Sequence, residues 1–228
     1  MSESRAKISG APQCGLYIKI GSDYAMDVLT RDLKQILLVI NNSAYEKNMH
    51  AIELAVNKDD PDFIEKAQSL CAFAKLKGIV PIMADDPVIA QQAGAEGVML
   101  PQPENVAKAR ELLGDSAIIG MRCGIAPERA AAAFDAEVDY VGFGTGKKSL
   151  PSLDALKFWT MLTDKPAVIE GPISNDHCAY YVQAGAGFID AGDYIWSHPK
   201  GVMQGTVNMM HAIDLALAQD TPQTDKMQ

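Results

Sequence analysis

The sequence lacks any long hydrophobic run. No apolar stretch is longer than Ile36–Ile40, and the N-terminal segment MSESRAKISGAPQ has no apolar core. A helix that spans a membrane needs roughly 20 apolar residues, and a secretory signal peptide needs a central apolar segment. We therefore expect a cytoplasmic protein that neither crosses a membrane nor is exported.

Positive charge is also in short supply. The chain has 20 Lys and Arg residues against 29 Asp and Glu residues, which gives a formal net charge of −9. Nucleic acids and anionic membranes are bound through clustered Lys and Arg, which this sequence does not show. We expect neither as a partner, so any phosphate that the protein binds must be held by a local group of donors.

Cysteine is scarce and widely spaced. The four cysteines, Cys14, Cys71, Cys123 and Cys178, form no Cys-x-x-Cys pair and no metal-ligand spacing. This pattern favours reduced thiols that pack in the core of a protein from a reducing compartment.

The remaining composition is that of a globular domain. Of 228 residues, 48% are hydrophobic and 21% are charged, which suffices for a buried core. Small and polar residues dominate both ends. We expect one domain over residues 15–217, with flexible segments at 1–14 and 218–228.

Short apolar runs alternate with segments of amphipathic helical spacing. The expected strands are 16–20, 51–56, 79–83, 97–100, 117–121, 138–143, 167–169 and 187–191; the expected helices between them are 60–77, 103–113, 127–134, 151–162, 174–183 and 202–218. Eight strand and helix repeats predict an α/β fold, a (β/α)8 TIM barrel, with an open doubly wound sheet as the alternative.

One segment of this map is ambiguous. Residues 24–50 contain QILLVINN, which fits either a strand or the buried face of a helix. We favour a helix, because a strand here would be the ninth.

Candidate site residues follow the expected strands, where a barrel carries its active groups. Lys58, Arg122, Lys147 and Lys148 would converge on the mouth and suit a diphosphate or carboxylate ligand, although the two consecutive lysines also fit a solvated loop. Gly171 and Gly192 follow the last two strands, which is the usual phosphate position in a barrel.

Three carboxylates are candidate magnesium ligands. Asp85, Asp86 and Glu104 lie after the third and fourth expected strands, and Mg²⁺ takes carboxylate oxygens together with water and phosphate. Asp86 precedes Pro87 and is more typical of a helix N-cap, so Asp85 is the better ligand candidate.

Two stretches, PIMADDPVIAQQAGAEGVMLPQPENVAKARELLGDSAIIGMRCG and EVDYVGFG, resemble the thiamin phosphate synthase family and its relatives, the aromatising thiazole tautomerases. The resemblance implies a barrel that joins a pyrimidine diphosphate to a thiazole phosphate and releases diphosphate, with Mg²⁺ holding the diphosphate. Ionisation of the pyrimidine leaves a carbocation that the thiazole nitrogen captures. Such chemistry depends on positioning and charge neutralisation.

The resemblance transfers to particular residues and also fails at some. Together with the positions after the strands, it implies metal ligands Asp85 and Glu104, catalytic cations Lys58, Arg122 and Lys147, and substrate contacts Gln102, Thr145, Gly171 and Gly192. Family anchors are absent at Leu54, Val56, Ala84, Met99 and Pro172, and Arg122 stands where the family has Ser.

Two hypotheses follow from this mixture. In the first, the chain is an active thiamin phosphate synthase-like transferase for small phosphorylated heterocycles, either as a single chain or as a homo-oligomer. In the second, it is a barrel of the same family that has lost catalysis and binds a phosphorylated ligand or regulates. A tautomerase is a weaker third reading, because Gly124 lies where that branch has its general base His.

Overall fold

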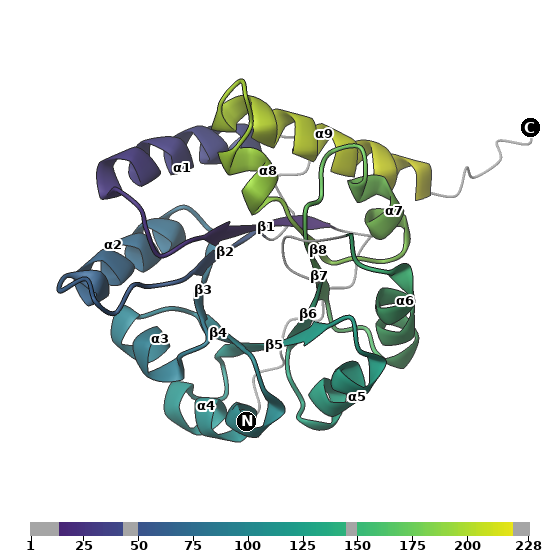
Figure 1. The fold of residues 1–228 in the computed structure, drawn as a ribbon, viewed down its shortest axis with the longest axis horizontal. Coiled ribbons are helices and arrows are strands. Elements are labelled where there is room, and N and C mark those ends of the chain that lie inside the picture. The colour runs from purple at the N-terminus through teal and green to yellow at the C-terminus, as the bar shows by residue number, and fades with distance from the viewer. Residues whose placement is uncertain (1–13, 43–49, 145–149, 221–228) are drawn as a thin grey trace, which may run out of the picture.

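The strands of the protein close into a single barrel. The computed structural model describes residues 14–42, 50–144 and 150–220. Eight parallel strands pair in chain order, and the last pairs with the first. The helices form a ring around them (Figure 1). The predicted (β/α)8 barrel is confirmed, and the open sheet is excluded.

The elements alternate as the sequence predicts. The strands are β1 (Gly15–Ile20), β2 (Ala51–Leu54), β3 (Val80–Ala84), β4 (Gly97–Leu100), β5 (Ile118–Gly124), β6 (Tyr140–Gly144), β7 (Ala167–Glu170) and β8 (Phe188–Asp190). The helices are α1 (Met26–Asn41), α2 (Phe63–Leu76), α3 (Pro87–Ala93), η1 (Pro103–Asn105), α4 (Val106–Leu113), α5 (Pro127–Asp135), α6 (Leu153–Leu162), α7 (Cys178–Gln183), α8 (Gly192–Trp196) and α9 (Val202–Asp220).

The structure settles one ambiguous element of the sequence map and adds one helix to it. QILLVINN lies in α1, which confirms the helical interpretation. The short helix α8 after β8 has no counterpart among the expected helices. The expected domain limit at 217 falls inside α9, and the segments 1–13 and 221–228 lie outside the described residues.

Strand order and spacing depend on small residues where strands approach closely. β3 and β4 are adjacent and parallel, with Ile82 opposite Gly97. On its other side Gly97 pairs with Ile118 of β5, and a Cβ on Gly97 would lie 2.0 Å from the carbonyl oxygen of Ile118. Only glycine allows β4 and β5 to pair in this way.

Helix boundaries follow local signals. The Asp86 side chain accepts the backbone N–H groups of Val88 and Ile89 at 2.9 and 3.2 Å and caps α3, as expected of Asp before Pro. Gly94 ends the same helix with a φ of 66°. Gly185, after α7, has a φ of 93°, which glycine adopts without strain.

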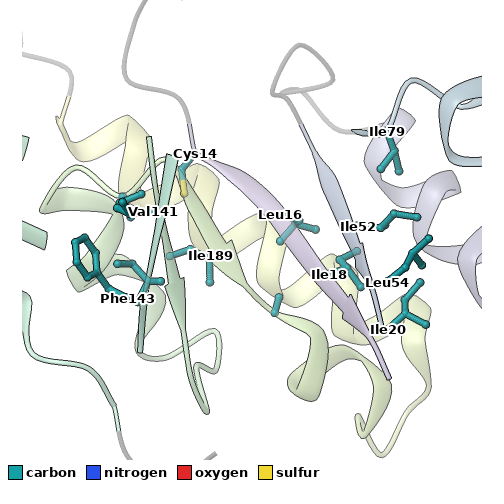
Figure 2. Close-up of a cluster of buried hydrophobic side chains, with 14 of the residues drawn as sticks. Cys14, Leu16, Ile18, Ile20, Ile52, Leu54, Ile79, Val141, Phe143 and Ile189 are labelled. Atoms are coloured by element: carbon teal, nitrogen blue, oxygen red, sulfur yellow. The ribbon is translucent and has the colours of Figure 1, made fainter. Parts of the chain in front are cut away.

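The main hydrophobic core lies between the barrel and its helices. Alternate strand residues such as Leu16, Ile18 and Ile52 face outward and are buried there (Figure 2). The alternation sends the residues between them into the barrel. All four cysteines are buried, in agreement with the packing role predicted for them.

No helix among the described residues is long and apolar enough to cross a membrane.

Candidate functional site

The interior of the barrel is divided into two layers. Nearer the N-terminal ends of the strands is an apolar layer, composed of Tyr17, Ala51, Ile82, Met99, Tyr140 and Val168. Toward the C-terminal ends is a charged layer, composed of Lys19, Glu53, Arg122, Glu170 and Asp190. Active groups of (β/α)8 barrels project from the C-terminal ends of the strands, so the charged layer is the candidate site.

Arg122 lies at the centre of the charged layer. Its Nη1 donates to Glu170 Oε1 at 2.8 Å, and its Nη2 donates to Glu53 Oε1. Burial lowers the pKa of Arg122, but the carboxylates of Glu53 and Glu170 outweigh burial and raise it. Arg122 is therefore a permanent cation whose orientation is fixed by two charge-assisted hydrogen bonds.

Glycine on β6 makes room for this pair. A Cβ on Gly142 would lie 2.7 Å from Glu170 Oε1, closer than non-bonded atoms approach. A side chain at this position would displace Glu170 and with it one partner of Arg122.

Lys19 joins the two remaining carboxylates. Its Nζ lies 3.1 Å from Glu170 Oε2 and 3.3 Å from Asp190 Oδ2. Burial lowers the pKa of Lys19, but Glu170 and Asp190 raise it above its usual value. The ammonium group therefore stays charged and is shared between two carboxylates.

Asp190 is the buried carboxyl group at the end of β8. Its Oδ1 accepts the backbone N–H of Gly192 at 3.1 Å. Burial raises the pKa of Asp190 to about 6, against the opposing effects of Lys19 and the Gly192 N–H. Asp190 therefore gains a proton at a higher pH than an ordinary aspartate does.

Tyr17 connects the two layers. Its hydroxyl donates to Glu53 Oε2 at 2.8 Å and lies 3.2 Å from the hydroxyl of Tyr140. Burial, followed by the charge of Glu53, raises the pKa of Tyr17 well above its ordinary value. The phenol is therefore a neutral donor that fixes the second oxygen of Glu53.

The predicted cation Lys58 lies at the rim. Its Nζ contacts Asp86 Oδ2 at 2.8 Å, and 63% of its side chain is exposed. Asp86 is at the same time the N-cap of α3. Lys58 is thus paired with a capping residue and takes no part in the charged layer.

The two predicted metal ligands have different surroundings. Asp85 has a φ of 63°, its side chain is 61% exposed, and its Oδ1 lies 3.8 Å from Arg122 Nε. Glu104 lies in η1 and lines a groove with Arg110 and Lys165. Within the described ranges, no group of three or more His, Cys, Asp or Glu side chains is arranged to hold a metal ion. These two carboxylates do not assemble a metal centre by themselves.

The predicted substrate contacts are distributed around the mouth. Gln102 is exposed, and its Oε1 accepts from Arg129 Nη1 at 3.3 Å. Gly171 follows β7, and its carbonyl accepts the N–H of Ile173 at 2.8 Å. Gly192 opens α8, with its N–H engaged by Asp190. Thr145 and Lys147 lie outside the described residues.

Sequence reasoning missed Lys19, Glu53 and Asp190. Each lies inside an apolar run rather than after one, in LYIKI, AIEL and FID. The available signal was the single charge within an alternating strand, because such a residue on a barrel strand must either face inward or disturb the helix-facing core.

The fold and the mouth define a class of protein. A closed parallel barrel with fixed cations and carboxylates at the C-terminal ends of its strands is a (β/α)8 protein built for a small polar ligand. Residues 28–192 match the family model described as thiamine monophosphate synthase. The chain belongs to this family.

Curated relatives agree with this assignment. The chain is 32% identical over 143 residues to the thiamine-phosphate synthase of Erythrobacter litoralis, and this match covers 58% of this chain and 66% of that protein. The match to the enzyme of Rhodospirillum centenum is 30% over 154 residues and covers 63% and 74%. For Xanthomonas campestris it is 36% over 153 residues and covers 62% and 72%. The chain thus spans about two thirds of the length of these relatives.

Solved structures share the fold. The thiamine phosphate pyrophosphorylase of Pyrococcus furiosus superposes with a TM-score of 0.70 at 19% identity, covering 90% of this chain and 98% of that one. Tryptophan synthase of Mycobacterium tuberculosis superposes with a TM-score of 0.62 at 16% identity, covering 89% and 93%. Likeness at this level establishes the barrel and does not select a reaction.

Proposed function

We propose that this chain is a thiamin phosphate synthase-like transferase that joins a pyrimidine diphosphate to a thiazole phosphate. The C–O bond between the pyrimidine methylene and diphosphate breaks, and a C–N bond to the thiazole nitrogen forms. The two electrons of the broken bond leave with diphosphate. The proposal is supported by the family match over residues 28–192 and by the fixed guanidinium of Arg122.

Arg122 is the observation that carries the proposal. Its guanidinium is held by Glu53 and Glu170, while 27% of its side chain remains exposed at the mouth. A cation that is already oriented stabilises the negative charge that develops on a leaving diphosphate without reorganising first. Arginine has five N–H donors, so two bonds to carboxylates leave capacity for a ligand.

The test is direct product formation. The purified chain would be incubated with the pyrimidine diphosphate, the thiazole phosphate and Mg²⁺, and thiamin phosphate and diphosphate would be quantified. We expect both products in equal amounts, and we expect Arg122→Lys to lower kcat/KM by about 100-fold. Arg110→Lys is the matched control. Arg110 also forms an ion pair, with 2.8 Å between its Nη2 and Asp139 Oδ2, but this pair lies away from the mouth. Absence of product from the unsubstituted chain would exclude the transferase.

A barrel without catalysis that binds a phosphorylated ligand is the second candidate. It is favoured by the engagement of mouth groups within the protein: Lys58 with Asp86, and the Gly192 N–H with Asp190. In that case thiamin phosphate would raise the melting temperature by mass action, while no product would form.

The proposal has three further parts. A small phosphorylated heterocycle is the partner, bound by a single chain or by a homo-oligomer. The cytoplasm is the location, supported by the small number and wide spacing of the cysteines. Mg²⁺ is an expected requirement for turnover, and the described carboxylates alone do not assemble a centre for it.

A further inference from the structure

The charged layer contains more negative than positive groups. Three carboxylates, from Glu53, Glu170 and Asp190, share two cations, Lys19 and Arg122. All three carboxylates are buried, each with at most 9% of its surface exposed. An anionic ligand that enters this mouth therefore meets an excess negative charge at short range.

Asp190 is the carboxylate that competes most directly with such a ligand. One of its oxygens lies 3.3 Å from Lys19 Nζ, and the other accepts the Gly192 N–H at 3.1 Å. Lys19 comes from β1 and Gly192 follows β8, so both donors lie beside the end of β8, where a barrel places a ligand phosphate. A Cβ on Gly192 would lie 3.1 Å from the backbone nitrogen of Lys19, so α8 begins close against β1 and leaves Asp190 little space to turn aside.

We propose that Asp190 determines the specificity of the mouth for anions: its carboxylate competes for Lys19, so an anionic phosphate or sulfate group binds with uptake of one proton by Asp190. The inference rests on phosphate binding at the mouth, as in the proposed function, and adds the residue that controls it. Protonation leaves Lys19 with one carboxylate partner, Glu170, and lets the ammonium group donate to the incoming anion.

The groups that face Asp190 agree with this coupling. Lys19 and the Gly192 N–H favour the ionised form, while burial and Glu170 favour the protonated form. Tyr17 lies opposite Asp190 in the pairing of β1 with β8 and stays neutral. Arg122 is bound by Glu53 and Glu170. The resulting pKa of about 6 makes the proton available in the neutral range.

The test uses sulfate, because it remains a dianion between pH 5 and 8 and cannot itself supply the proton. Calorimetric titrations at pH 7, in two buffers of different ionisation enthalpy, give the number of protons taken up on binding. We expect close to one proton for the unsubstituted chain and none for Asp190→Asn. With a pKa of about 6, linkage predicts that Asp190→Asn binds sulfate about thirtyfold more tightly than the unsubstituted chain at pH 7.5.

Asp193→Asn is the matched control, since it removes the same charge from an exposed position three residues further on. It should leave both the affinity and the proton uptake as they are. Binding to the unsubstituted chain without proton uptake overturns the proposal, as does Asp190→Asn binding no more tightly than the unsubstituted chain, including the case where neither binds. The proton uptake is measured on the unsubstituted chain, so this part of the test does not depend on whether a variant folds. Failure of the proposed transferase would appear separately, as absence of thiamin phosphate alongside an intact Asp190 effect.

Discussion

The apolar layer and the charged layer share strands and are separated by two residues along each strand that they share. Tyr17 and Lys19 are two residues apart on β1, and Val168 and Glu170 are two residues apart on β7. The first residue of each pair packs against apolar neighbours, whereas the second forms ion pairs. Both residues of each pair point into the barrel. The one nearer the N-terminal end of the strand belongs to the packed apolar layer, and the one nearer the C-terminal end belongs to the charged mouth.

The difference shows what each layer contributes. The apolar layer gains stability from burial and is insensitive to pH in its aliphatic part. The five ionisable groups of the charged layer lose hydration, and their mutual pairing offsets this cost only in part, so the layer adds little net stability. Each layer therefore predicts a different response to substitution.

The largest loss of stability should come from Arg122→Met. The substitution leaves Glu53 and Glu170 buried without their common cation, which costs about 4 kcal/mol in the free energy of unfolding. Urea unfolding at pH 7.5 measures it. A loss below about 1 kcal/mol would mean that the pairing does not balance the buried charges.

Met99→Ala should rank next and should behave as a simple cavity. Met99 is fully buried in the apolar layer, and truncation of such a side chain costs about 3 kcal/mol. The same urea experiment at pH 5 and pH 7.5 should give equal losses. A strongly pH-dependent loss would join this residue to the charged layer and remove the distinction.

The pH dependence of stability should change in Asp190→Asn. The folded-state pKa of about 6 lies above the ordinary value of about 3.9, so between these values the folded chain holds a proton that the unfolded chain has released. The contribution of Asp190 to the free energy of unfolding is fully present below about pH 4 and falls by about 2 kcal/mol as the pH rises through 6. Comparing unfolding free energies of both proteins at pH 4, 5, 6 and 7 isolates it. Parallel curves would contradict the raised pKa.

The smallest stability effect is expected for Asp85→Asn. The side chain is 61% exposed and lies 3.8 Å from Arg122 Nε, so the melting temperature should hardly move, with a cost below about 0.5 kcal/mol. If Asp85 helps to bind Mg²⁺ with the diphosphate, thiamin phosphate formation should fall by about 100-fold and should require added Mg²⁺. Normal turnover in the variant, or in the presence of a chelator, would remove Asp85 and Mg²⁺ from the proposal.

The barrel could be predicted because its signals are local. Each strand is an apolar run of a few residues, and helix ends are marked by Asp86 and Pro87, by Gly94 and by Gly185. α8 escaped prediction because five residues, Gly192–Trp196, are too few for a helical period to be visible. Strand limits differ from the expected ones by up to three residues, since pairing with neighbours decides them.

The candidate site could be predicted only where its residues follow strands. Arg122, Gly171 and Gly192 were predicted in this way. Lys19 and Asp190 were not, because their contact depends on closure of the barrel between β1 and β8, more than 170 residues apart in the chain. No local sequence pattern predicts the pairing of β1 with β8. The neighbours that make Arg122 a fixed cation, Glu53 and Glu170, likewise come from distant strands.

We expect the charged layer to bind the ligand and the apolar layer to support it. The most direct measurement is a calorimetric titration of thiamin phosphate into the unsubstituted chain, Lys19→Met and Met99→Ala, at a temperature where all three are folded. Lys19 contacts Glu170 and Asp190 at the mouth, so we expect Lys19→Met to weaken binding at least about tenfold. Met99→Ala should bind as the unsubstituted chain does. Equal affinities for both variants, or a loss confined to Met99→Ala, would contradict the account.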